Sequence, residues 1–157
     1  MLVLTFRVAD APFAVAVGRV VEVVPRVPLR ALPHAPAYLA GLLHFRGRAV
    51  PVVDLGSLIG GSPCANRLNT RIILVETGGR GTGKPKNLLG LVAERVDDVR
   101  AVDAAAAALP ASSYEEAPYL GAVFQVDDGL IQMVEPDRVL PELPTPDEFP
   151  LPAVVTP

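Results

Sequence analysis

The feature that most constrains the fold of this chain is an internal repeat. The segment "YLAGLLHFRGRAVPVVDLGSLI" (38–59) aligns without a gap with "YLGAVFQVDDGLIQMVEPDRVL" (119–140), so that Tyr38 matches Tyr119. Each copy has two apolar, strand-like runs around a turn, followed by an acidic residue and a short helical turn. Asp54 is expected to cap the first of these helical turns. A repeated unit of this kind predicts two small folded copies that share a core, because each alone would have a marginal one.

The segments upstream of the two copies also correspond. The stretch "FAVAVGRVVEVV" (13–24) resembles "LGLVAERVDDVR" (89–100) in the second half of the chain. This alignment pairs three positions of the first copy with three of the second, namely Arg19 with Arg95, Val20 with Val96 and Glu22 with Asp98. The repeat therefore includes the strands before the loops at 25–37 and 100–118, and it covers most of the chain.

The composition indicates that these repeated elements are strands. The 157 residues include 17 prolines and 13 glycines spread along the chain, which leave little room for long helices. Short β-branched runs lie between the turn signals, and 50% of the residues are hydrophobic, which is ample for a core. We therefore expect an all-β protein built from small barrels.

Charge and residue usage exclude several classes of function. The net charge is −3 and the basic residues form no stripe, so nucleic acid is not an expected partner. A single cysteine and two histidines exclude an internal disulfide and argue against a metal site. No cofactor is expected. The N-terminus lacks the basic region of a signal peptide, and no apolar run approaches the roughly 20 residues of a membrane helix. A cytoplasmic protein without membrane insertion is the expectation.

The stretch "TGGRGTGKPK" (77–86) has the spacing G-x-x-x-x-G-K of a nucleotide-binding P-loop. A working P-loop places Ser or Thr after the lysine and opens a helix. Here Pro85 follows Lys84, and the next residues resemble a strand. In the repeat this stretch replaces the turn at 9–12, so we expect a lengthened hairpin tip. A nucleotide-binding switch using residues 78–84 is kept as a remote alternative.

No arrangement of side chains suggests catalysis. His44 lies inside an apolar run, His34 in a proline-rich loop, and Cys64 beside a proline in a chain break. Adjacent acidic residues on a strand point to opposite faces, so they form no acid-base pair. The protein is therefore not expected to be an enzyme.

The segment "HAPAYLAGLLHFRGRAVPVVDL" (34–55) strongly resembles the CheW family, the adaptor proteins of bacterial chemosensory arrays. The positions that fit the family pattern are Pro36, Gly41, Arg46, Gly47, Pro51, Asp54 and Leu55. The opening strands and the second copy fit in order as well, so the resemblance covers about residues 2–141.

The resemblance implies a fold of two small five-stranded, SH3-like barrels from an internal duplication, packed on a shared core. It implies a CheW-like domain over residues 1–141, with a first barrel at about 1–60, a second at about 68–141, and possible exchange of strands between them. Residues 142–157 are rich in proline and are expected to form an extended tail.

The resemblance also implies a non-enzymatic function. Such a protein couples the cytoplasmic tip of a methyl-accepting chemoreceptor to the regulatory domain of a CheA-type histidine kinase, at membrane-associated receptor arrays. Carried over by position, the partner-binding residues are Val20, Glu22, Arg46, Gly47, Val96 and Val99. The valines would line an apolar groove between the barrels, and Arg46 would couple receptor and kinase from a turn. The plain alternatives are that the valines fill the barrel core and that Arg46 binds local carbonyls or a nearby acid.

Some residues depart from the family pattern. His44 and Phe45 replace its Asn-Leu, Pro136 replaces an apolar residue, and the 77–87 tip is long. These departures leave open whether the chain serves swimming, twitching or another output. A regulatory domain of a larger kinase or fusion protein is the second hypothesis. Met1, directly before the first strand, argues against it.

Overall fold

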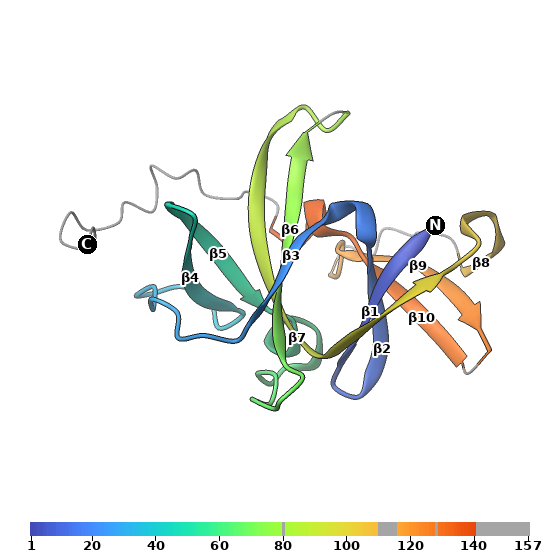
Figure 1. Ribbon diagram of the computed structural model, residues 1–157, viewed down its shortest axis with the longest axis horizontal. Helices are drawn as coiled ribbons and strands as arrows, with labels where there is room; N and C mark the ends of the chain where they lie inside the picture. The colour runs from blue at the N-terminus through green and yellow to red at the C-terminus, as the bar shows by residue number, and fades with distance from the viewer. Residues whose placement is uncertain (80, 110–115, 128, 141–157) are drawn as a thin grey trace.

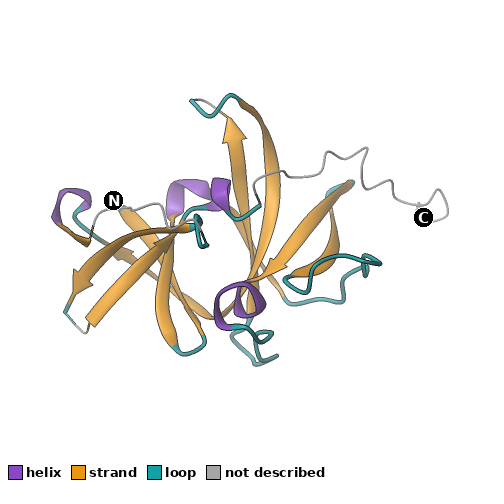
Figure 2. Cartoon of the chain, turned by 180° about the vertical axis from the view of Figure 1, so that it is seen from behind, coloured by secondary structure: helices purple, strands orange, loops and turns teal. Residues whose placement is uncertain are grey.

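The computed structural model describes residues 1–79, 81–109, 116–127 and 129–140, and strands dominate this part of the chain (Figure 1). The strands are β1 (Leu2–Val8), β2 (Ala11–Ala16), β3 (Val20–Pro25), β4 (Leu39–Phe45), β5 (Arg48–Asp54), β6 (Arg71–Gly79), β7 (Lys84–Ala101), β8 (Ala107–Leu109), β9 (Leu120–Val126) and β10 (Gly129–Val134). Figure 2 shows that the helical pieces are single turns: η1 (Val17–Arg19), η2 (Gly56–Gly60), η3 (Ala104–Ala106) and η4 (Pro136–Arg138). The all-β prediction is confirmed.

The strands form two groups that share β7 (Figure 1). Barrel A consists of β1, β2, β8, β9, β10 and the second half of β7. Barrel B consists of β3, β4, β5, β6 and the first half of β7. The division within β7 falls at Arg95, whose φ of 50° is rare for a residue other than glycine. The long strand therefore bends there and passes from one barrel to the other.

The two barrels exchange strands. β3 follows β2 along the chain but pairs with β6 of barrel B, and the second half of β7 pairs with β1 of barrel A. Residues 1–60 consequently contribute strands to both barrels. The expected boundaries at about 60 and 68 do not follow this strand pairing, because each hairpin is completed by the strand that leaves the other hairpin.

Strand register shows that the sequence repeat is a structural repeat. Val52 pairs with Gly90 in barrel B, and their counterparts in the sequence alignment, Met133 and Ala14, pair with each other in barrel A. The backbone N–H of Asp54 donates to the carbonyl of Tyr38 at 2.8 Å, and the counterpart bond from Glu135 to Tyr119 measures 2.7 Å. Residues of one barrel can therefore be compared with their counterparts in the other.

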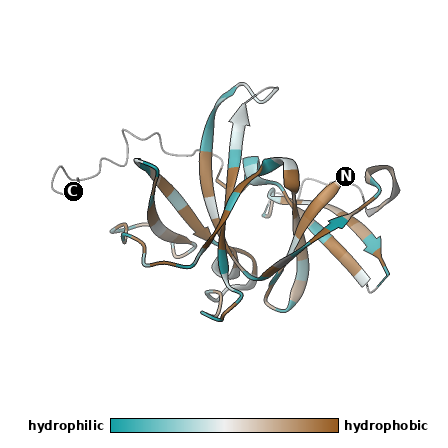
Figure 3. Ribbon diagram, viewed as in Figure 1, coloured by the Kyte–Doolittle hydropathy of each residue, from teal (hydrophilic) through white to brown (hydrophobic). Residues whose placement is uncertain are grey.

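The central strand β6 buries both of its faces. On β6, Ile73 and Val75 pack in a core shared by the two barrels, whereas Ile72 and Leu74 pack inside barrel B. The shared core takes residues from β1, β2, β5, β6, β7 and β10, and a third cluster fills barrel A. Figure 3 shows the resulting apolar colouring along these strands. Burial of both faces explains why the runs are continuously apolar instead of alternating.

The glycine-rich stretch is the end of the β6–β7 hairpin, as predicted. Thr77 pairs with Asn87 and Gly79 with Lys84, so the chain continues as a strand where a P-loop would open a helix. The predicted tail at 142–157 lies outside the described residues. No helix within the described residues is long and apolar enough to cross a membrane.

Candidate functional site

The turn between β4 and β5 presents Arg46 to solvent. Phe45 pairs with Arg48, which leaves Arg46 and Gly47 as the two central residues of a tight hairpin. Both have positive φ, 49° and 77°, as a type I′ turn requires. The glycine at the second position adopts this conformation at little cost. The turn therefore determines the direction in which the arginine leaves the barrel.

Arg46 and Glu22, predicted as site residues from separate segments, lie together. The Nη2 atom of Arg46 donates to the Oε1 atom of Glu22 at 2.9 Å, and its guanidinium lies 4.7 Å from the centre of the Phe45 ring. The side chains are 70% and 39% exposed, respectively. Arg46 therefore binds a nearby acid, as the plain alternative for this residue expected. A surface pair of this kind contributes only about 0–1 kcal/mol, so a partner can replace it.

Val20 and Val96 lie at equivalent positions of the repeat. Both are half-buried and pack against the shared core from opposite barrels. Their contacts fit the plain alternative, in which they fill the core. Their partly exposed surface lies at the junction between the barrels.

Val99 differs from these two because its side chain is 58% exposed. Its counterpart in barrel B is Val23, which is also exposed, and Val21 beside it is a third exposed valine. Val23 and Val21 were not predicted. The alignment that pairs Val20 with Val96 also pairs Val23 with Val99, so the repeat carried the signal for Val23.

An ion pair at the junction of the barrels was also not predicted from the sequence. Arg19 in η1 pairs with Asp137 in η4 and donates to the carbonyl of Glu76 at 3.2 Å. The other carboxylate oxygen of Asp137 accepts from the backbone N–H of Gly78 at 2.8 Å. These contacts tie elements of both barrels to the base of the long hairpin. Arg19 and Asp137 lie far apart in the sequence, and no local sequence pattern predicts their contact.

Asp54 organises the loop that follows β5. Its Oδ1 atom accepts from the backbone N–H groups of Gly56 at 2.8 Å and Ser57 at 3.2 Å. Asp54 therefore binds the start of the helical turn as expected, but from one residue before the N-cap position of η2, which is Leu55. It also accepts from the backbone N–H of Cys64 at 3.0 Å. Burial, reinforced by the charge of Asp54, raises the pKa of the Cys64 thiol from 9.0 to about 12. The thiol is therefore protonated at neutral pH and is a poor nucleophile.

The part of the chain that the structure describes holds no cluster of three or more His, Cys, Asp or Glu side chains arranged for a metal ion. His44 is exposed on β4. Five of the six predicted residues are thus the Arg46–Glu22 pair, which joins the β4–β5 turn to β3, the half-buried Val20 and Val96, which pack against the shared core, and the exposed Val99. Gly47 shapes the turn.

Comparison with known proteins agrees with this architecture. A family model described as "CheW-like domain" matches residues 2–143. The "Chemotaxis protein CheW" of Rhizobium meliloti is 30% identical over 141 residues, which span 88% of this chain and 86% of that protein. The "Probable chemotaxis protein CheW" of Rhizobium etli is 26% identical over the same shares of the two chains.

A solved structure shares the fold. The scaffolding protein TtCheW from Thermoanaerobacter tengcongensis superposes with a TM-score of 0.73 at 23% identity, covering 86% of this chain and 84% of that one. With the family model matching almost from end to end, this chain belongs to the CheW-like domain family.

Proposed function

We propose that this protein is a non-enzymatic scaffold of a chemosensory pathway, which couples the cytoplasmic tip of a methyl-accepting chemoreceptor to the regulatory domain of a CheA-type histidine kinase. The observation that carries the proposal is the family match over residues 2–143, combined with the duplicated barrels on one core. A protein with this role would act at membrane-associated receptor arrays. The described residues 77–79 and 81–87 form the end of a β-hairpin and not the helix that phosphate binding needs, so the nucleotide-switch alternative has no support in the described fold.

The receptor contact is proposed for the junction of the barrels. A receptor helix is an amphipathic element, and apolar side chains spaced along a surface suit its apolar face. The exposed Val99, with Val20 and Val96 partly exposed beside the shared core, supplies such side chains. Val23, the exposed counterpart of Val99, is added to the predicted set.

The Arg46–Glu22 pair is proposed as the polar part of the contact. An exposed ion pair can open at low cost, and each partner can then bind an opposite charge on another protein. The type I′ turn holds the backbone of Arg46, which limits the ordering cost of binding.

The receptor contact is tested by titrating the protein with a helical receptor-tip fragment. Arg46→Ala and Val99→Ala should each weaken binding about tenfold, since each removes one direct contact. Arg30→Ala is a matched control, because Arg30 is an exposed arginine in a different loop. Equal affinity of Arg46→Ala and the control would remove Arg46 from the site.

A further inference from the structure

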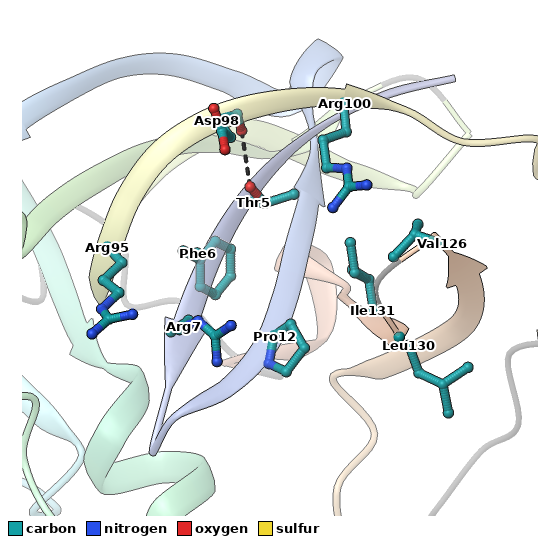
Figure 4. Close-up of a pocket in the computed structure, with 11 residues that line it drawn as sticks. Thr5, Phe6, Arg7, Pro12, Arg95, Asp98, Arg100, Val126, Leu130 and Ile131 are labelled. Carbon is teal, nitrogen blue, oxygen red and sulfur yellow. Dashed lines mark hydrogen bonds between the residues drawn. The ribbon is translucent and has the colours of Figure 1, made fainter.

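The inside of barrel A ends in a charged pocket of about 240 Å³, which none of the predicted contacts uses (Figure 4). Val3 and Ala14 pack within the barrel, and the same faces of β1 and β2 continue outward to Thr5, Arg7 and Pro12. On β7, Asp98 and Arg100 pair with Thr5 and Val3, so they share this inward face. We call this open end the barrel A mouth.

The repeat supplies an internal comparison, because the corresponding end of barrel B is plugged. Leu74 pairs with Glu22 as Thr5 pairs with Asp98, so Leu74 is the counterpart of Thr5. In the alignment of the two copies, Leu88 replaces Pro12 and Val24 replaces Arg100. These three side chains pack in the core of barrel B. Small barrels are ordinarily filled with apolar side chains. Barrel B follows this rule at this end, whereas barrel A is open there.

The lining of the barrel A mouth carries more positive than negative charge. Arg7, Arg95 and Arg100 line the mouth, and Asp98 is the single acidic residue among the described residues of its lining. The whole chain, by contrast, has 17 acidic and 14 basic residues. Figure 4 shows the guanidinium groups reaching the pocket from β1 and β7. Guanidinium groups bind carboxylates through paired, charge-assisted hydrogen bonds.

Arg95 and its counterpart Arg19 have different residues at the equivalent neighbouring position of the repeat. Arg19 binds Asp137, but the residue that corresponds to Asp137 in the other copy is Gly56. The acid that would hold Arg95 at the junction of the barrels is thus replaced by a glycine, and the Arg95 side chain lies at the mouth instead.

The size and rim of the mouth favour an occupant that belongs to a larger molecule. The volume of about 240 Å³ is below the roughly 300–1,000 Å³ of typical small-molecule sites. Leu130 on the rim is 56% exposed and offers an apolar contact beside the arginines. We propose that the barrel A mouth binds an acidic segment of a partner protein, in which a carboxylate enters between Arg7 and Arg100 and an apolar neighbour covers Leu130. This contact goes beyond the proposed receptor contact, because Val99 and Arg100 point to opposite faces of β7.

The test uses the full chain and the synthetic peptide Ser-Gly-Glu-Leu-Glu-Leu-Gly-Ser, followed by amide chemical shifts. The expected result is saturable shifts confined to the β1–β2 and β9–β10 hairpins and the second half of β7, weakened by added salt. A peptide with Gln in place of Glu should not bind. Arg7→Gln and Arg100→Gln should each weaken binding about tenfold, and Arg67→Gln, a change at an exposed arginine elsewhere, should leave it unchanged.

Three outcomes would overturn the proposal. The first is equal binding of the Gln peptide, and the second is unchanged affinity in both arginine variants with their folded spectra intact. The third is citrate occupying the mouth more tightly than the peptide, which would make the occupant a small organic anion. Because none of these involves the receptor tip or the kinase domain, failure here leaves the proposed function standing.

Discussion

Leu89→Ala tests whether the two barrels fold as one unit. Leu89 is fully buried on β7 and belongs to the shared core, which also contains Phe6 and Val15 of barrel A and Ile73 of barrel B. Truncating a buried leucine leaves a cavity and costs about 2–5 kcal/mol. A domain of ordinary stability has about 5–15 kcal/mol in total, so the loss is a large fraction of it.

Chemical denaturation measures this loss. Far-UV circular dichroism reports the strands of both barrels. The near-UV signal of the three tyrosines reports side-chain packing, to which the bond from the Tyr119 hydroxyl to the carbonyl of Leu58 contributes. We expect both probes to move to a lower midpoint together, with an unchanged slope. Leu68→Ala is the control, because Leu68 is exposed and its loss should change the free energy of unfolding by less than about 0.5 kcal/mol.

The reasoning is refuted if the two probes separate into two transitions in Leu89→Ala. It is also refuted if only one probe shifts. Either result would mean that the protein does not unfold as one cooperative unit.

Three further predictions concern single sites. Cys64 should resist thiol reagents in the native protein at pH 8 and react on unfolding. Because the native pKa of about 12 exceeds the ordinary value of 9.0, the unfolded protein loses the thiol proton first, and the free energy of unfolding should fall as the pH rises from 9.0 to about 12. This fall should be less steep in Cys64→Ala. Arg19→Ala should lower the free energy of unfolding by about 1–2 kcal/mol and Arg95→Ala by much less, since only Arg19 holds the junction ion pair; equal losses in denaturation would contradict this. Gly78→Ala should destabilise the long hairpin more than Gly81→Ala, measured by amide exchange, because both have positive φ but only Gly78 would place a Cβ 2.1 Å from a carbonyl oxygen.

Much of the fold could be predicted because the repeat and the apolar runs are local signals. The alignment of the two copies identified the two strand pairs and the hairpin that replaces a P-loop. The local sequence also indicated that Asp54 binds the start of the helical turn after β5. The exchange of β3 and the second half of β7 was only left open. Pairing partners of equal apolar character cannot be ranked from their sequence, since β3 would suit either hairpin.

Less of the candidate site could be predicted from the sequence. The family pattern brought Glu22 and Arg46 onto the same list, but their contact depends on how β3 lies beside the turn of another hairpin. The mouth of barrel A was not predicted at all, because Arg7, Arg95 and Arg100 are dispersed and gather only through strand register. Once the register is known, comparing Thr5 with Leu74 shows the opening at once.

The central claim is that this protein binds a kinase regulatory domain as a scaffold. It is tested most directly by calorimetric titration with the regulatory domain of a CheA-type kinase from the same organism, using injections into buffer as the blank. The account predicts saturable binding at a ratio of one to one, with no nucleotide required. Absence of binding to every CheA-type kinase of that organism would contradict it, and the fold would then stand without the proposed role.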